Sequence, residues 1–106
     1  MSSELRRTEN EFILQSRNDS IADKVKDIAP GDTGKSISLH FKCECSDLNC
    51  GREITLRIDE YQRMTKNIGR FIVFPLHEQL DIETAIEHYP EYNIVEKRLD
   101  LVEKAA

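Results

Sequence analysis

Three cysteines restrict the folding of this chain more than any other feature of its sequence. Cys43, Cys45 and Cys50 lie within eight residues, and no other cysteine occurs in the chain. Their odd number, in a chain that starts without an apolar signal segment, argues against a framework of disulfide bonds. Three thiols so close together are instead typical of a metal site, for which the fold must bring all three side chains to one point.

The cysteines lie between two segments in which polar and apolar residues alternate. In residues 36–45 every odd position is apolar or cysteine and every even position is polar, which predicts a half-buried strand. The same alternation at Ile54, Leu56 and Ile58 predicts a second strand. Residues 46–51 then join the two strands as a hairpin.

The spacing of the cysteines fits a metal site at the end of this hairpin. Cys43 and Cys45 are two residues apart on a strand, so both side chains leave the same face. Cys50 returns after a loop of four residues, and the neighbouring Gly51 permits close approach of the backbone to an ion. Zn²⁺ takes four tetrahedral sulfur or nitrogen ligands, whereas an iron–sulfur cluster usually requires four thiolates. We therefore predict one zinc ion per chain.

The fourth ligand must come from one of three histidines. His40 lies on the polar face of the first strand, opposite the cysteines, and His88 lies on a predicted helix. His77 follows the third predicted strand, in a loop that can reach the end of the hairpin. We predict that His77 completes a Cys3His site. Its second ring nitrogen is expected to donate to a backbone carbonyl or to the carboxylate of Glu78 or Asp81.

Residues 4–28 are predicted to form one long helix. Its helical stripe consists of Leu14, Ile21, Val25 and Ile28. Asn18 occupies the gap in this stripe. Two arrangements fit: the stripe packs on its own chain, or it pairs with a second copy in a homodimer whose register Asn18 sets. The first residues are mostly polar, so we expect the helix to extend beyond the body of the fold at its N-terminal end.

The remaining segments are predicted to complete an α+β fold. Asp59 and Gln62 resemble a capping box at the start of a short helix that ends at Gly69. Asp81 and Pro90 mark the start and the end of another helix. The predicted strands of this part span residues 71–74 and 92–95.

These elements predict a long N-terminal helix followed by a small, mostly antiparallel sheet in the order β-β-α-β-α-β. We divide the chain into an N-terminal helix at residues 1–28, an α+β metal-binding domain at 36–98, and a tail or frayed helix at 99–106. The linker between the first two parts is punctuated by Pro30 and by glycines.

Composition and charge exclude several kinds of partner. The net charge of −5 argues against a protein that coats nucleic acid. No apolar run approaches the roughly 20 residues that cross a bilayer, so we expect a cytoplasmic protein without membrane contact. Residues 29–36 resemble a phosphate-binding loop, but a predicted helix precedes them and a strand follows, the reverse of what such a loop requires. We expect no nucleotide binding.

Several segments together carry a resemblance to known proteins. They are residues 7–12 (RTENEF), Asn18, Ile21, residues 41–45 (FKCEC), Cys50, residues 60–61 (EY), residues 70–77 (RFIVFPLH) and residues 94–97 (IVEK). In these segments the chain resembles a small family of uncharacterised bacterial proteins and fused modules. The resemblance implies a shared fold and a metal site made of the three cysteines and His77, and it implies no activity. In that family a glycine usually precedes the histidine, where Leu76 stands here.

We predict a small zinc-binding interaction or regulatory module with a structural Cys3His site, which binds a protein partner or a second copy through its first helix. It is not expected to be an enzyme, because no general base lies at a diagnostic spacing; an open fourth position would instead favour a catalytic zinc. One alternative is a nucleic-acid-binding regulator that uses Arg6, Arg7 and Arg17, although acidic residues balance this face. The other is a thiol-based redox sensor that releases its metal on oxidation.

Overall fold

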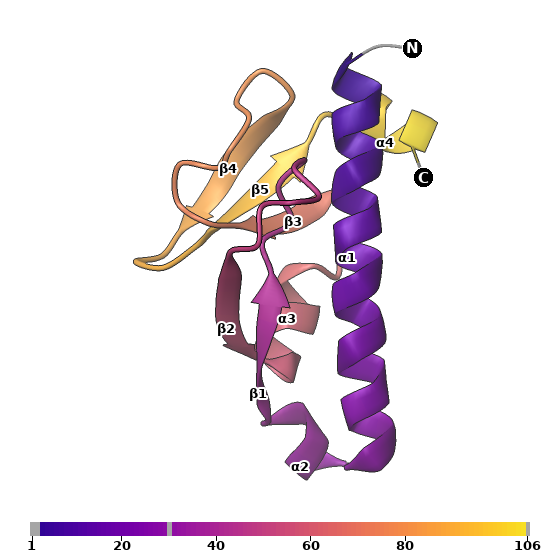
Figure 1. The fold of residues 1–106 in the computed structure, drawn as a ribbon, viewed down its shortest axis with the longest axis vertical. Helices are drawn as coiled ribbons and strands as arrows, with labels where there is room; N and C mark the ends of the chain where they lie inside the picture. The colour runs from indigo at the N-terminus through magenta and orange to yellow at the C-terminus, as the bar shows by residue number, and fades with distance from the viewer. Residues whose placement is uncertain (1–2, 30, 106) are drawn as a thin grey trace.

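One long helix runs beside two small antiparallel sheets in the computed structural model, which describes residues 3–29 and 31–105 (Figure 1). The elements are α1 (Ser3–Ile28), α2 (Asp32–Lys35), β1 (Ser38–Lys42), β2 (Glu53–Arg57), α3 (Ile58–Met64), β3 (Arg70–Val73), β4 (Glu83–His88), β5 (Asn93–Lys97) and α4 (Leu99–Ala105). The predicted α+β class is confirmed. Pro30, the proline of the predicted linker, lies outside the described residues. Within the described ranges, no helix is both long enough and apolar enough to span a membrane.

The predicted hairpin is present. β1 and β2 pair antiparallel, with Phe41 opposite Ile54 and His40 opposite Thr55. Phe41 and Ile54 are buried, whereas the residues beside them are exposed, as the alternation predicts. The second strand ends one residue earlier than predicted, because Ile58 already belongs to α3.

The other three strands form a separate sheet in the order β3-β5-β4, with antiparallel neighbours. The single sheet of the prediction is therefore two sheets. They meet just after β1, where the N–H of Glu44 donates to the carbonyl of Ile72 at 2.8 Å. Phe41 stacks on Tyr61 of α3 with ring centroids 4.1 Å apart, and both share a buried core with Ile94 of β5. The end of the hairpin is thus held against the second sheet.

The predicted helix at residues 81–89 is wrong, because Glu83–His88 form β4. The apolar residues of this segment match a helical period over only about two turns. β5 lies beside them, and β4 pairs with it along one edge, with a bulge between Ala85 and Glu87. Such a short period does not distinguish a helix from a strand, and here the available partner strand decides. His88 accordingly lies on a strand.

α3 also differs from its prediction at both ends. Arg57 precedes the helix, and its N–H donates to the carboxylate of Glu60 at 3.3 Å, so the capping interaction starts two residues before Asp59. The helix ends at Met64 and not at Gly69. Ile68, which was expected on its buried face, is 66% exposed.

The long first helix is confirmed, and the predicted stripe is buried only in part: Leu14 is buried and Val25 packs against the core, but the two isoleucines of the stripe are exposed. Ile21 and Ile28 are 39% and 83% exposed. The buried residues are Thr8, Glu11, Leu14, Asn18 and Ala22. Three of these five side chains are polar, so α1 packs largely through hydrogen bonds and ion pairs, which hydrophobic periodicity does not reveal.

The N-terminal end of α1 packs against the fold, so its predicted extension beyond the fold is wrong. Arg7 forms an ion pair with Asp81 at 2.7 Å, and Thr8 is fully buried. α4 lies beside this end of the helix (Figure 1) and buries Leu101 and Val102. The last described residues therefore form a docked helix.

Candidate metal centre

Cys43 and Cys45 follow β1 at the point where the hairpin strands separate. The N–H of Cys43 donates to the carbonyl of Arg52 at 2.9 Å, which extends the hairpin pairing beyond Lys42. The predicted alternation also continues: both cysteines are buried, and the side chain of Glu44 between them lies among different neighbours. The strand pattern therefore places both sulfurs on one side of the chain, as expected.

A tight loop returns Cys50 to the other two cysteines. Asp47 organises this loop: its carboxylate accepts the N–H of Asn49 at 2.9 Å, and its carbonyl accepts the N–H of Cys50 at 3.0 Å. Gly51 then adopts a φ of +73°, which glycine reaches without strain. In the structure this glycine serves to reverse the chain into β2.

His77 is presented by a turn that follows β3. Its N–H donates to the carbonyl of Phe74 at 2.9 Å, and Pro75 and Leu76 fill the two central positions. Leu76 has a φ of +73°. A type II turn requires such a φ at its third position and favours proline at its second, and glycine is its usual third residue. Leu76 is the one non-glycine residue with positive φ in the described ranges, and it lies directly before the predicted ligand.

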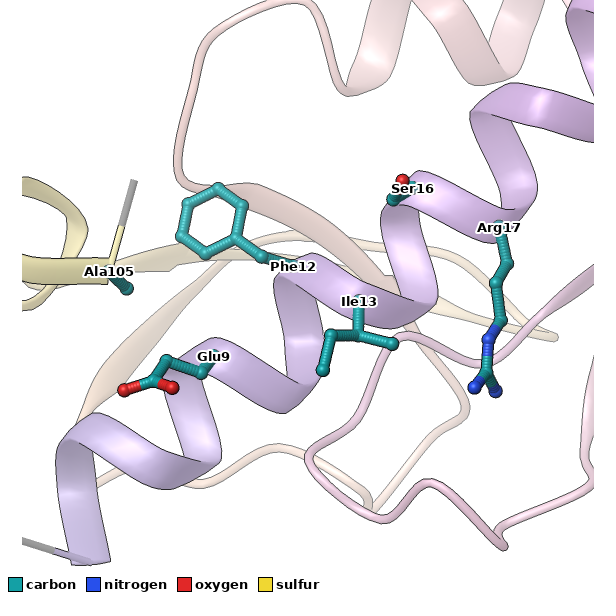
Figure 2. A pocket seen from close by; sticks show the side chains of 6 residues that line it. All are labelled: Glu9, Phe12, Ile13, Ser16, Arg17 and Ala105. Atoms are coloured by element: carbon teal, nitrogen blue, oxygen red, sulfur yellow. The ribbon is translucent and has the colours of Figure 1, made fainter.

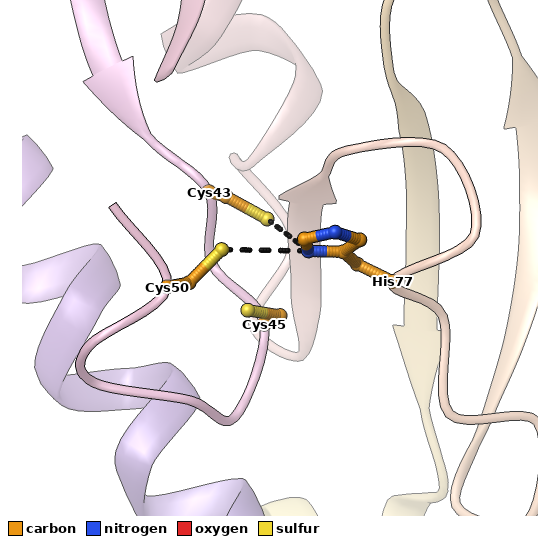
Figure 3. Close-up of side chains that lie close together, drawn as sticks. All are labelled: Cys43, Cys45, Cys50 and His77. Carbon is orange, nitrogen blue, oxygen red and sulfur yellow. Dashed lines mark hydrogen bonds between the residues drawn. The ribbon is translucent and has the colours of Figure 1, made fainter. Parts of the chain in front are cut away.

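The structure brings the four predicted ligands together. Cys43, Cys45, Cys50 and His77 point toward a common centre (Figure 3), and their ligand atoms all lie within 4.8 Å of one another. Nδ1 of His77 is 3.6 Å from Sγ of Cys43 and 3.4 Å from Sγ of Cys50. A sulfur and a nitrogen bound to one tetrahedral zinc ion at ~2.3 Å and ~2.0 Å lie roughly 3.5 Å apart. The side chains therefore fit a four-coordinate metal site.

Burial and the closeness of the thiols to one another shift their pKa values in different directions. Hydrogen bonding with Cys43 lowers the pKa of Cys45 to about 5, and the same contact together with burial raises the pKa of Cys43. Burial raises the pKa of Cys50. The backbone N–H of Phe74 donates to Sγ of Cys43 at 3.1 Å, an interaction that favours negative charge on this sulfur. A cation bound between the sulfurs would displace their remaining protons.

A small cavity of about 170 Å³ opens beside Cys43 and Cys50. Arg17 of α1, Lys42 of β1 and Arg52 of the hairpin loop contribute positive charge to its wall. A zinc ion held by three thiolates and a neutral imidazole would carry a formal charge of −1, which cations in the wall of this cavity would partly offset. The sequence already placed Lys42 and Arg52 beside the cysteines, but it did not indicate that Arg17 of α1 lies near them.

Glu44 is the residue near the site whose importance the sequence did not reveal. It is fully buried, and its carboxylate accepts hydrogen bonds from Asn18 Nδ2 at 2.9 Å, from the Ile72 N–H at 3.0 Å and from the Tyr61 hydroxyl. Burial raises the pKa of Glu44 to about 7 in spite of these hydrogen bonds. The alternation placed Glu44 opposite the cysteines, but it could not show that α1 and α3 cover that face.

Asn18 serves its own chain, so the hypothesis that it sets the register between two copies is wrong. Its Oδ1 accepts the N–H of Lys42 at 2.8 Å, and its Nδ2 donates to the carbonyl of Lys42 at 2.9 Å as well as to Glu44. The side chain is fully buried. A polar residue within an apolar stripe indicated a specific contact, but not where its partner lies.

The other histidines lie away from the centre, as predicted. Nδ1 of His40 is 2.9 Å from the Thr55 hydroxyl on the exposed face of the hairpin, and His88 is exposed on β4. Neither belongs to the group of candidate ligands around Cys43.

The carboxylates predicted to support His77 have other partners. Glu78 accepts a hydrogen bond from the side chain of Asn93, and Asp81 pairs with Arg7. Glu78 is thus engaged by β5 and Asp81 by α1. Their closeness to His77 in sequence was therefore a poor guide.

A second depression, of about 440 Å³, lies along α1 near the end of α4 (Figure 2). Its lining residues are Glu9, Phe12, Ile13, Ser16, Arg17 and Ala105. They include neither a thiol nor an imidazole. Among residues 3–29 and 31–105, the three cysteines and His77 form the one group of three or more candidate ligands close enough to hold a metal ion.

In comparisons with protein-family models, curated proteins and solved structures, no significant match to this chain was found.

Proposed function

We propose that this protein is a small zinc-binding module whose Cys3His centre stabilises the fold. The observation that carries the proposal is the convergence of Cys43, Cys45, Cys50 and His77, with sulfur–nitrogen distances of 3.4 and 3.6 Å that suit a single tetrahedral ion. An ion there would tie the end of the hairpin to the turn after β3. It would stabilise the contact between the two sheets.

Zinc is the metal that best matches this ligand set. Three thiolates and one imidazole are soft and borderline ligands, which suit zinc and do not suit magnesium or calcium. Four protein ligands leave no open position for water or substrate, and this supports a structural role over a catalytic one. We accordingly propose a regulatory or interaction module and not an enzyme.

The metal content of the purified full-length protein tests the proposal directly. We expect one zinc ion per chain by elemental analysis and by native mass spectrometry. We also expect a lower melting temperature after chelation, because metal binding and folding are linked. Metal-free protein that melts at the same temperature as the loaded protein would contradict the structural role.

Three histidine variants provide a matched comparison. His77→Ala should weaken zinc retention and lower the melting temperature, because it removes the nitrogen ligand. His40→Ala and His88→Ala should change neither, since both side chains are exposed and remote from the sulfurs. Equal zinc affinity in all three variants would exclude His77 as a ligand.

A thiol-based redox sensor is the second candidate, favoured by the cavity that reaches Cys43 and Cys50. Two thiolates would reduce hydrogen peroxide: its O–O bond breaks, two protons are taken up, two water molecules leave, and a disulfide replaces two metal ligands. Hydrogen peroxide should then release zinc, and a dithiol reductant should restore binding. Zinc retention during treatment that oxidises exposed thiols of other proteins would eliminate this candidate.

We propose the outer face of α1 as the site for a protein partner or a second copy. Ile13, Ile21 and Ile28 are 42%, 39% and 83% exposed there, within roughly 80° of one another around the helix. Sedimentation of the full chain against an Ile21→Glu, Ile28→Glu variant tests self-association. Nucleic-acid binding through this helix is less well supported, because Arg7 is engaged by Gln79 and Asp81.

A further inference from the structure

α1 contacts both chain segments that carry the candidate metal ligands. Asn18 binds the backbone of Lys42 on both its N–H and its carbonyl, and also binds Glu44, so it contacts the residues on either side of Cys43. One turn earlier, Gln15 donates to Glu44 at 3.3 Å. The helix thus holds the first ligand-bearing segment by its side chains.

Closer to the N-terminus of α1, further contacts reach Ser46, which follows Cys45, and the segment that carries His77. Asn10 donates to the carbonyl of Ser46 at 2.9 Å. Arg7 donates to the side chain of Gln79 at 2.6 Å, two residues after His77, and Gln79 in turn donates to the hydroxyl of Ser46. Consecutive turns of one helix therefore hold the cysteine segment and the histidine segment beside each other.

Glu44 connects these helix contacts to the core. Its N–H and its carboxylate bind the carbonyl and the N–H of Ile72, at 2.8 and 3.0 Å. Because Glu44 lies between Cys43 and Cys45, it cannot move without moving both sulfurs. The position of the sulfur pair is therefore fixed by α1 on one side and by β3 on the other.

We propose that Asn18 and Gln15 are positioning residues for the metal centre, acting through Lys42 and Glu44, so that metal binding and docking of the middle of α1 strengthen each other. This inference rests on the proposed zinc-binding function. Loss of a group that hydrogen-bonds directly to a metal ligand typically weakens metal affinity about 10–100-fold, and we expect the lower end of this range for hydrogen bonds to the residues beside the ligands. Linkage is reciprocal, so the metal must tighten the docking of α1 by the same factor. The helix becomes the element that responds to the metal.

Zinc affinities of full-length variants, measured by competition with a chromophoric chelator, test the positioning role. Asn18→Ala and Gln15→Ala should each weaken zinc affinity, Asn18→Ala by about tenfold or more. The matched control is Lys26→Met, which removes a polar contact between the same helix and Gln62 of α3, away from both ligand segments. It should leave zinc affinity within about twofold of the wild type, a change too small to indicate lost positioning. If Asn18→Ala does not fold, Gln15→Ala alone decides.

Hydrogen exchange of the full chain supplies a readout that a merely structural role would not change. In the wild type, zinc should slow exchange of the amides around residues 14–22 more than that of the amides at 24–28. Asn18→Ala should abolish this difference. Wild-type protein that binds no zinc would refute the proposed function itself. A wild type that binds zinc, with Asn18→Ala and Gln15→Ala of unchanged affinity or with no zinc-dependent protection of α1, would refute the inference alone.

Discussion

The two segments that supply the candidate ligands are built differently. The cysteine segment reverses direction at Gly51, whose φ of +73° carries no strain, and it is anchored in the core by the fully buried Glu44. The histidine segment reverses at Leu76, which has the same φ but is a branched residue and is 92% exposed. Helix α1 contacts both segments, but only the cysteine segment reverses without strain, whereas the histidine segment reverses at a residue that disfavours the conformation.

This difference indicates how the site is assembled. On the cysteine side, hydrogen bonds from α1, α3 and β3 hold Glu44, and with it the two flanking sulfurs, in place. His77 closes the site from a turn whose geometry costs about 1–2 kcal/mol at Leu76. A bound ion would offset that cost, since it adds a bond between the histidine and the sulfurs. Substitutions in each segment can test this account.

The largest effect is expected when the anchor of the cysteine segment is removed. Glu44→Ala should lower the free energy of unfolding by about 3–5 kcal/mol, because it leaves buried donors on Asn18 and Ile72 without an acceptor. Chemical denaturation in excess zinc provides the measurement. Glu44→Gln, which keeps an acceptor of similar shape, is the control and should lose less. An unchanged stability in Glu44→Ala would show that the cysteine segment is not anchored by this residue.

The second largest effect is expected in a buried polar cluster that lies outside both ligand-bearing segments, and it tests whether this cluster influences metal binding. Lys97 is buried between Glu11 and Glu83, and burial together with the charge of Glu83 raises the pKa of Glu11 to about 9, from an ordinary value of 4.5. Folding raises the pKa of this carboxyl, so the folded state binds its proton more tightly than the unfolded state does. This stabilises the fold fully at a pH below the ordinary pKa of 4.5. This contribution is lost as the pH rises to about 9.

Glu11→Gln should therefore be more stable than the wild type at pH 8, by about 1–3 kcal/mol, with a smaller difference at pH 5. Thermal denaturation across this pH range measures it. Zinc affinity should stay unchanged, because Glu11 contacts neither ligand-bearing segment directly. A variant that weakens zinc binding would show that the two polar clusters are coupled.

A smaller effect is expected at the turn of the cysteine segment. Gly51→Ala should destabilise the protein by about 1 kcal/mol, because a φ of +73° is strained for any residue with a Cβ. The added methyl group has room, since the nearest atom to its position is the carbonyl oxygen of Asn49 at 3.9 Å. The loss therefore reports backbone strain and not a steric clash. Denaturant titration of the zinc-loaded variant is the measurement.

The smallest effect is expected from the opposite substitution, to glycine, at the turn of the histidine segment. Leu76→Gly should stabilise the protein by about 0.5–1 kcal/mol, since relief of the strain exceeds the entropy that glycine adds to the unfolded chain. Leu76 is almost fully exposed, so little apolar contact is lost. The same denaturant titration applies. If Gly51→Ala and Leu76→Gly shift stability in the same direction, the contrast between the two segments is wrong.

The grouping of the candidate ligands was predictable because their spacing in sequence translates directly into geometry. Alternation along a strand places Cys43 and Cys45 on one side, and a short loop returns Cys50 to them. His77 followed by elimination, since His40 has the wrong strand parity and Pro75 ends β3 just before the loop. The α+β class came from the same reading of strands and turns. The helix predicted at residues 81–89 was wrong because a helical period of about two turns does not distinguish a helix from a strand, and this segment pairs with β5, which follows it after a short turn.

By itself, then, the sequence determined the features that depend on neighbouring residues: the hairpin, the long first helix, the common side of the two cysteines and the loop that returns the third. The tertiary structure decided what covers each face. It alone shows that Asn18 contacts its own hairpin, that Glu44 is buried, and that Arg7 and Gln79 join α1 to the histidine segment. These contacts join polar groups that are distant in the chain. A buried apolar face produces a periodic pattern in the sequence, whereas a set of hydrogen bonds produces none, so the sequence could not predict these partners.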